Sequence, residues 1–158
     1  MSADELPPPS PRLVAAYDAE RFRADGHAVI DRLADHLAAA ADGPVLPWQA
    51  PTAAIAAWPD DFPDEPDPAA DLVTTIERTL AGSIRLHHPR YLGHQVPPPL
   101  PAAALADAMA ALLNNGMAVY EMGGVATPHE LAVVSWMART LGLPDGAGGL
   151  LTSGGSLG

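Results

Sequence analysis

Apolar residues recur at every third or fourth position in several stretches of this chain, and that spacing predicts amphipathic helices. The first helix is expected from Asp18, which can cap its start, to Gly43–Pro44, which stops it. A second long helix is expected to begin at Asp67–Pro68, because proline is tolerated in the first helical position. The apolar face of the first helix is formed by Phe22, Gly26, Val29, Leu33, Leu37 and Ala40.

Two further helix patterns follow in the second half of the chain. A third helix is expected over residues 102–113, ending near Asn115–Gly116. The fourth has the clearest start signal, because Thr127 and Glu130 have the spacing of a capping box, in which two side chains satisfy backbone N–H groups reciprocally. Gly142 is expected to end this helix.

Proline-rich segments separate the helices. Residues 1–17 form a polar lead that is expected to be disordered. Residues 44–66 contain six prolines and are expected to be a connector with one short helical turn at residues 52–58. The prolines in residues 87–101 exclude a helix there. The connector carries three large apolar residues that are expected to pack on another body, namely Trp48, Trp58 and Phe62.

The C-terminal stretch has a different pattern from the helices. Residues 148–158 read as a short buried strand that runs into a glycine–serine turn, and the chain stops where a helix is expected to begin. The pattern therefore predicts a mostly α segment with one short strand near its C-terminus.

Composition and charge narrow the possible partners. Hydrophobic residues make up 48% of the chain, but alanine supplies much of this share and buries little area, so the expected core is thin. The formal net charge is 8 − 19 = −11, which repels nucleic-acid phosphates and anionic membranes. The absence of cysteine fits a reducing compartment, and the acidic N-terminus is unlike a signal peptide. We therefore expect a cytoplasmic protein with neither nucleic-acid nor membrane partners.

Two short stretches carry candidate chemistry. In Ser153–Ser156 the glycines let the backbone approach an anion, and its N–H groups and a serine hydroxyl can donate to a phosphate. Turns of this composition are also common where nothing binds. His94 lies in a proline-stiffened loop, where binding groups are often held, whereas the other histidines are expected at the surface or at helix caps rather than in a metal site.

Seven short motifs follow one another between Asp18 and Gly158, in order and with sensible spacing. They are Phe22-Arg23-x-x-Gly26-His27-x-x-Ile30-Asp31, His88-Pro89-Arg90-Tyr91-Leu92-Gly93-His94, Leu105-Ala106-Asp107, Leu112-Leu113-Asn114, Thr127-x-x-Glu130 with Trp136, Leu141-Gly142-Leu143-Pro144 and Leu151-Thr152-Ser153-Gly154-Gly155-Ser156. This ordered set resembles the group II pyridoxal-phosphate decarboxylases, which include the aromatic-amino-acid, glutamate and diaminobutyrate decarboxylases.

The resemblance implies the N-terminal part of an α/β enzyme with the aspartate-aminotransferase-like fold (fold type I of these enzymes), working as an intertwined homodimer on an amino-acid substrate. It matches Gly154, Gly155 and Ser156 to positions that bind the phosphate of pyridoxal 5'-phosphate. It matches His94, Gln95 and Val96 to the loop that walls the substrate site, although this loop lacks the family's aromatic residues. Residues 18–86 would be the helical dimerisation segment, and residues 87–158 the start of the cofactor-binding large domain.

The same resemblance implies that the chain is inactive alone and contains no catalytic residue. The family's cofactor-binding lysine lies beyond the phosphate loop, and all eight basic residues of this chain are arginines. We expect the chain to be cut within that loop, with Gly158 a natural end, a frameshift or one part of a split gene. A homodimer, or a complementing C-terminal portion, is the expected partner. The alternatives are a non-enzymatic helical dimerisation or interaction module and a small phosphate- or nucleotide-binding protein.

Overall fold

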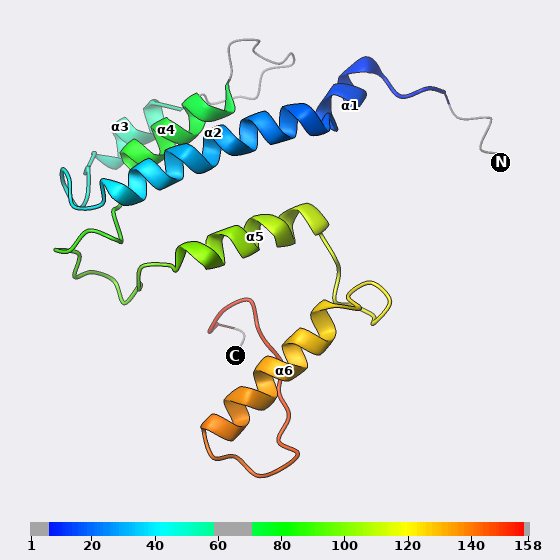
Figure 1. The fold of residues 1–158 in the computed structure, drawn as a ribbon. Coiled ribbons are helices and arrows are strands. Elements are labelled where there is room, and N and C mark those ends of the chain that lie inside the picture. Colours follow the sequence, from blue (N-terminus) through cyan, green and yellow to red (C-terminus); the bar gives the residue numbers. More distant parts are fainter. Residues whose placement is uncertain (1–6, 59–70, 157–158) are drawn as a thin grey trace. The chain divides into compact units, whose positions relative to one another are not determined.

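The computed structural model describes residues 7–58 and 71–156, and in these ranges it contains six α-helices and no strand (Figure 1). By contacts the chain divides into two compact units, Met1–Pro99 and Leu100–Gly158. The first unit holds α1 to α4, and the second holds α5 and α6. The mostly helical character expected from the sequence is therefore confirmed for the described residues.

The first unit begins with a short helix that the sequence pattern did not indicate. Helix α1 spans Pro11–Ala16, and the Ser10 hydroxyl accepts a 3.2 Å hydrogen bond from the Leu13 N–H at its start. The prediction that residues 1–17 are disordered is thus wrong for residues 11–16. A serine cap followed by proline at the first position is sufficient to start one helical turn.

Helix α2 spans Ala19–Ala38 and starts as the sequence predicts. One carboxylate oxygen of Asp18 accepts from the N–H groups of Glu20, at 2.8 Å, and Arg21, at 2.9 Å. These bonds satisfy two of the backbone donors that a helix start leaves without intrahelical partners. The helix ends at Ala38, before the predicted stop at Gly43–Pro44.

Helix α4, Leu72–Gly82, packs beside α2 in the first unit (Figure 1). An ion pair of 2.5 Å between Arg32 and Glu77 joins the two helices. The predicted start at Asp67–Pro68 lies outside the described residues, and the described helix is capped by Asp71. Its half-buried side chains follow helical spacing, namely Val73, Ile76 and Leu80.

The connector between α2 and α4 contains helix α3, Pro51–Ala56, close to the predicted helical turn at 52–58. The Arg78 guanidinium of α4 lies 4.1 Å from the centroid of the Trp58 ring, and Arg78 also donates to the carbonyl oxygen of Ala57. This cation–π contact holds the connector against α4. Trp48 remains 72% exposed, and Phe62 lies outside the described residues.

In the second unit, helix α5 spans Pro101–Leu113 and ends at Asn114, which has a left-handed φ of 44°. Helix α6 spans Ala126–Thr140, and Gly142, just beyond its C-cap, stops it as predicted. Gly142 has a φ of 70°, and the N–H of Leu143 donates to the carbonyl oxygen of Ala138 at 3.0 Å. This arrangement is a Schellman motif, which favours glycine at the left-handed position.

The predicted capping box at the start of α6 is wrong. The helix begins one residue before Thr127, and its N-cap position, Val125, has no side-chain capping bond. The carboxylate of Glu130 accepts a 2.8 Å hydrogen bond from the backbone N–H of Leu151 instead. Glu130 is therefore used to hold a distant loop rather than to close its own helix.

The predicted short strand near the C-terminus is also wrong for the described residues. Residues 148–152 run along α6, where Leu151 bonds to Glu130 and the Cβ position of Gly149 lies 3.1 Å from a methyl group of Val134. A strand needs a neighbouring strand for its backbone hydrogen bonds, and the described ranges supply none. The backbone N–H of Leu151 bonds to the Glu130 side chain of α6 instead of to a neighbouring strand.

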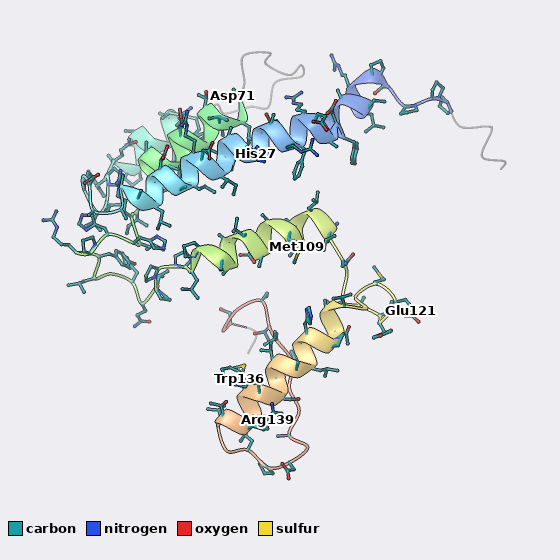
Figure 2. All side chains as sticks on the ribbon, viewed as in Figure 1. His27, Asp71, Met109, Glu121, Trp136 and Arg139 are labelled. Carbon is teal, nitrogen blue, oxygen red and sulfur yellow. The ribbon has the colours of Figure 1, made fainter. Side chains whose placement is uncertain are left out.

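Apolar side chains stay largely in contact with solvent in both units. Among the described residues no apolar side chain is buried, and the buried polar residue is His88, at 4% exposure. Figure 2 labels Met109 on α5 and Trp136 on α6, which are 59% and 60% exposed. The helices of each unit therefore present apolar faces that the described residues of the same unit do not cover.

Candidate functional site

The predicted substrate loop is anchored through the segment before it. After α4 the backbone N–H of Arg85 donates to the carbonyl oxygen of Val45 at 2.8 Å, and the Arg85 guanidinium donates to that of Ala39, also at 2.8 Å. Both acceptors follow the end of α2. The segment that leads into the loop is thus tied to the connector by a backbone bond and a charge-assisted bond.

His88 is the most buried polar residue of this region, at 4% exposure. Its Nδ1 accepts a 3.0 Å hydrogen bond from the Arg90 N–H, and its carbonyl oxygen accepts one of 2.9 Å from the Tyr91 N–H. The expectation of a surface or capping histidine is therefore wrong at this position. The sequence signal was Pro89, because a side-chain acceptor followed by proline favours a turn closed two residues further on.

The tautomer of His88 follows from its hydrogen bond. A backbone N–H can only donate, so Nδ1 of His88 carries no proton and the ring proton of the neutral side chain lies on Nε2. Within the described residues Nε2 is buried and has no hydrogen-bond partner. A buried donor without an acceptor costs about 1–3 kcal/mol.

The loop itself lies open to solvent. Residues Tyr91–Pro98 line a shallow hollow with a volume of 620 Å³. His94 and Gln95 both have left-handed backbone angles, with φ of 51° and 54°, and Val96 follows at 47% exposure. Two successive non-glycine residues in this region are uncommon and costly, and such conformations cluster at binding sites. The three predicted substrate residues are thus adjacent and accessible on one strained turn.

The predicted phosphate turn lies at the C-terminal end of the described residues. Gly154, Gly155 and Ser156 are exposed, and no side chain or backbone atom lies within 4 Å of the Cβ position of either glycine. Within residues 71–156 nothing accepts from their three N–H groups or from the Ser156 hydroxyl. Thr152 stabilises the turn by donating its hydroxyl to the carbonyl oxygen of Gly154 at 3.1 Å. The donor set therefore suits an oxyanion such as a phosphate.

The loop belongs to the first unit and the turn to the second. In the described part of the chain no group of three or more histidine, cysteine, aspartate or glutamate side chains is arranged to bind a metal ion. None of the described helices combines the length and the apolar character that crossing a membrane requires.

Comparisons with known proteins give a consistent result. No protein-family model matches the chain. Over 141 residues, 87% of the chain, it is 35% identical to tyrosine decarboxylase from Oryza sativa subsp. japonica. Over 148 residues it is 27% identical to 3,4-dihydroxyphenylacetaldehyde synthase from Drosophila melanogaster, again covering 87% of the chain.

A solved structure agrees with these sequence matches. The fold of 80% of the chain superposes on tryptophan decarboxylase from Catharanthus roseus in complex with L-tryptophan, with a TM-score of 0.69 and 26% identity. The chain spans 26% and 28% of the lengths of the two curated relatives and 28% of the solved chain. It therefore corresponds to about a quarter of each of these proteins.

Proposed function

We propose that this chain, which is homologous over most of its length to the group II amino-acid decarboxylases, is the N-terminal part of a pyridoxal-phosphate-dependent amino-acid carboxy-lyase. The observation that carries the proposal is the alignment with the rice tyrosine decarboxylase, which runs through 87% of the chain at 35% identity. It includes too much of the chain to rest on one short motif.

Gly154, Gly155 and Ser156 are the residues that would hold the phosphate of the cofactor. They fit it because their three N–H groups and a hydroxyl have no acceptor in the described residues, and because the glycine Cβ positions are open. When bound, pyridoxal phosphate supplies an electron sink for the carbanion that loss of CO₂ leaves. The role of this chain toward it is to bind and orient the phosphate end.

His94, Gln95 and Val96 would wall the amino-acid site. Their exposed turn presents an imidazole, a carboxamide and a small apolar side chain to a substrate bound at the turn. An imidazole and a carboxamide can hydrogen-bond a polar substrate, which favours a substrate with polar groups over a purely aromatic one.

The chain alone would be inactive because it contains no lysine to which the cofactor could be joined. Residues beyond this sequence would supply that lysine and the acidic partner of the cofactor ring. In this proposal residues 18–86 dimerise, residues 87–158 begin the cofactor-binding domain, and the assembled enzyme is a cytoplasmic homodimer.

The test is expression of the coding sequence together with its continuation beyond codon 158. We expect the extended protein to bind pyridoxal phosphate and to release CO₂ from at least one of tyrosine, tryptophan and 2,4-diaminobutyrate, with the 158-residue chain as the inactive control. Amine and aldehyde products are assayed separately, because the Drosophila melanogaster relative is named as an aldehyde synthase. An extended protein that binds no pyridoxal phosphate would refute the proposal and favour a helical interaction module.

A further inference from the structure

We propose that the neighbouring histidines His87 and His88 are positioning residues that hold the two ends of the loop Tyr91–Pro98 and thereby set the place of His94, Gln95 and Val96. The inference rests on the proposed function, because it concerns how the predicted substrate loop is shaped. Neither histidine contacts a substrate or cofactor in this proposal, so their action is indirect.

The near end of the loop is held by His88. Its Nδ1 accepts from the Arg90 N–H at 3.0 Å, and its carbonyl oxygen accepts from the Tyr91 N–H at 2.9 Å. Asparagine and aspartate make the same bond to the backbone two residues on, in the Asx-turn, so the imidazole here takes the place of an amide oxygen. Burial to 4% exposure removes competing water from this bond.

The far end of the loop is held by His87. Its Nε2 lies 2.8 Å from the carbonyl oxygen of Pro99, which can only accept, so Nε2 of His87 is the donor. Proline has no N–H, so Pro97, Pro98 and Pro99 cannot donate a backbone hydrogen bond to hold this end themselves. The side chain of His87 therefore provides a link that this part of the backbone cannot.

The loop between these two anchors needs such support. His94 and Gln95 occupy left-handed backbone angles of 51° and 54° without being glycines. Strained backbone of this kind persists only where its surroundings hold it. His87 and His88 together form a clamp on the loop. Arg85, just before this clamp, bonds to Ala39 and Val45, so the two histidines hold the loop from a segment that is itself fixed.

The test uses limited trypsin cleavage of the 158-residue chain, because trypsin cuts after arginine and Arg90 lies at the start of the loop. The variants are His87→Ala, His88→Ala and His88→Asn, with His27→Ala on the exposed surface of α2 as the matched control. Cleavage after Arg139, in α6, reports unfolding elsewhere in the same sample. Hydrogen exchange at the Arg90 amide is measured in parallel.

We expect His87→Ala and His88→Ala to accelerate cleavage after Arg90, and His88→Ala to speed exchange of the Arg90 amide by up to about tenfold. Cleavage after Arg139 should stay unchanged, and His27→Ala should behave as the wild type. His88→Asn should restore wild-type cleavage and exchange, because its amide oxygen can accept from the Arg90 N–H although the ring is gone.

Three outcomes would overturn the positioning role. His88→Asn as loose as His88→Ala would show that only the bulk of the ring matters. Variants indistinguishable from the wild type would show that neither bond holds the loop. Wild-type cleavage after Arg90 at the rate of the urea-unfolded chain would show that no clamp exists. If His88→Ala also accelerates cleavage after Arg139, His88→Asn alone decides. No cofactor or substrate is present, so these outcomes are independent of whether the extended protein decarboxylates.

Discussion

Ser156 is the residue of the proposed phosphate turn whose side chain can be removed without changing the backbone. In the extended protein its hydroxyl should donate to the cofactor phosphate, and a hydrogen bond to a charged group contributes about 1.5–3 kcal/mol. Ser156→Ala should therefore weaken pyridoxal-phosphate affinity about tenfold or more, while the fold is retained. Titration of the cofactor-free protein followed by absorbance measures the change.

Gly155→Val is the stronger variant of the same experiment. The Cβ position of Gly155 is open in this structure, so the valine side chain should be tolerated until a phosphate needs the space. We expect it to lose more affinity than Ser156→Ala. Equal affinity of Ser156→Ala and the wild type would show that the turn binds no phosphate.

Asp71 caps α4, and its titration should make the start of that helix sensitive to acid. The bond from the Thr74 N–H, helped by the Thr74 hydroxyl, lowers the pKa of the Asp71 carboxyl below its ordinary value of 3.8. A folded-state pKa below the unfolded value means that the cap stabilises the helix above about pH 4. That stability is lost as the pH falls through the lowered pKa.

The variants Asp71→Ala and Asp71→Asn separate charge from capping. Asparagine is a good N-cap that does not titrate, so Asp71→Asn should keep the first turn of α4 and lose the acid sensitivity. Asp71→Ala should fray that turn at every pH. Carbon chemical shifts of Leu72 to Thr75 between pH 6 and pH 2.5 report the outcome, and an acid response that persists in Asp71→Asn would contradict this assignment.

Single residues show where sequence reasoning succeeds and where it stops. The cap at Asp18 was predictable because an aspartate directly precedes a helical stripe. For the next long helix the sequence predicts a start at Asp67–Pro68, and the structure shows that Asp71 caps the described helix. His88 was missed because burial depends on neighbours distant in sequence, which no local pattern reveals.

At the scale of elements, the turn before α6 depends on Gly123. A Cβ at this position would lie 2.6 Å from the Met117 sulfur and 3.0 Å from the carbonyl oxygen of Gly116, so the Met117 side chain would have to move and the Gly116 backbone would have to shift slightly. Gly123→Ala should therefore destabilise the turn by about 1–3 kcal/mol. Hydrogen exchange of the Thr127 amide, which bonds to the Gly123 carbonyl oxygen at 2.8 Å, should accelerate.

Gly124→Ala is the control for this prediction. A Cβ at Gly124 would meet the Tyr120 carbonyl oxygen at 3.7 Å, which is ordinary contact, so this variant should resemble the wild type. Similar exchange rates in the two variants would mean that the turn has no close packing at Gly123.

The elements were predictable to different degrees for a physical reason. Helices α2, α5 and α6 follow from apolar spacing and end signals that lie within the segment itself. The predictions of a capping box and of a strand are wrong for one shared reason. The Glu130 carboxylate bonds to the Leu151 N–H, 21 positions away in the sequence. Of the candidate site, the sequence indicated the exposed loop and the turn, whereas the clamp at its base depends on contacts that appear only in the fold.

At the scale of the whole molecule, the isolated chain should associate. No apolar side chain is buried in the described residues, and Leu105, Met109 and Leu112 form one stripe of α5 that is 57% to 67% exposed. Burying such a side chain contributes about 1.5–3 kcal/mol. We expect sedimentation velocity to show an apparent mass of the chain that rises with its concentration. Replacement of these three residues by glutamine should lower that apparent mass.

Asp107→Asn, on the same helix, is the control because it changes charge without changing the apolar stripe. It should associate as the wild type does. A wild-type chain that stays monomeric and melts in one sharp, concentration-independent transition would contradict the prediction of association.

The packing of α2 on α4 has a consequence for the time course of synthesis. Residues 39–71 separate the two helices, and small helical units fold in about microseconds to milliseconds. A ribosome adds only about 5–20 residues per second. This helical pair can therefore fold as soon as Gly82 has left the ribosome, seconds before residue 158 is added. During that interval the Arg32–Glu77 ion pair would join α2 to α4, and the Arg78–Trp58 contact would join the connector to α4.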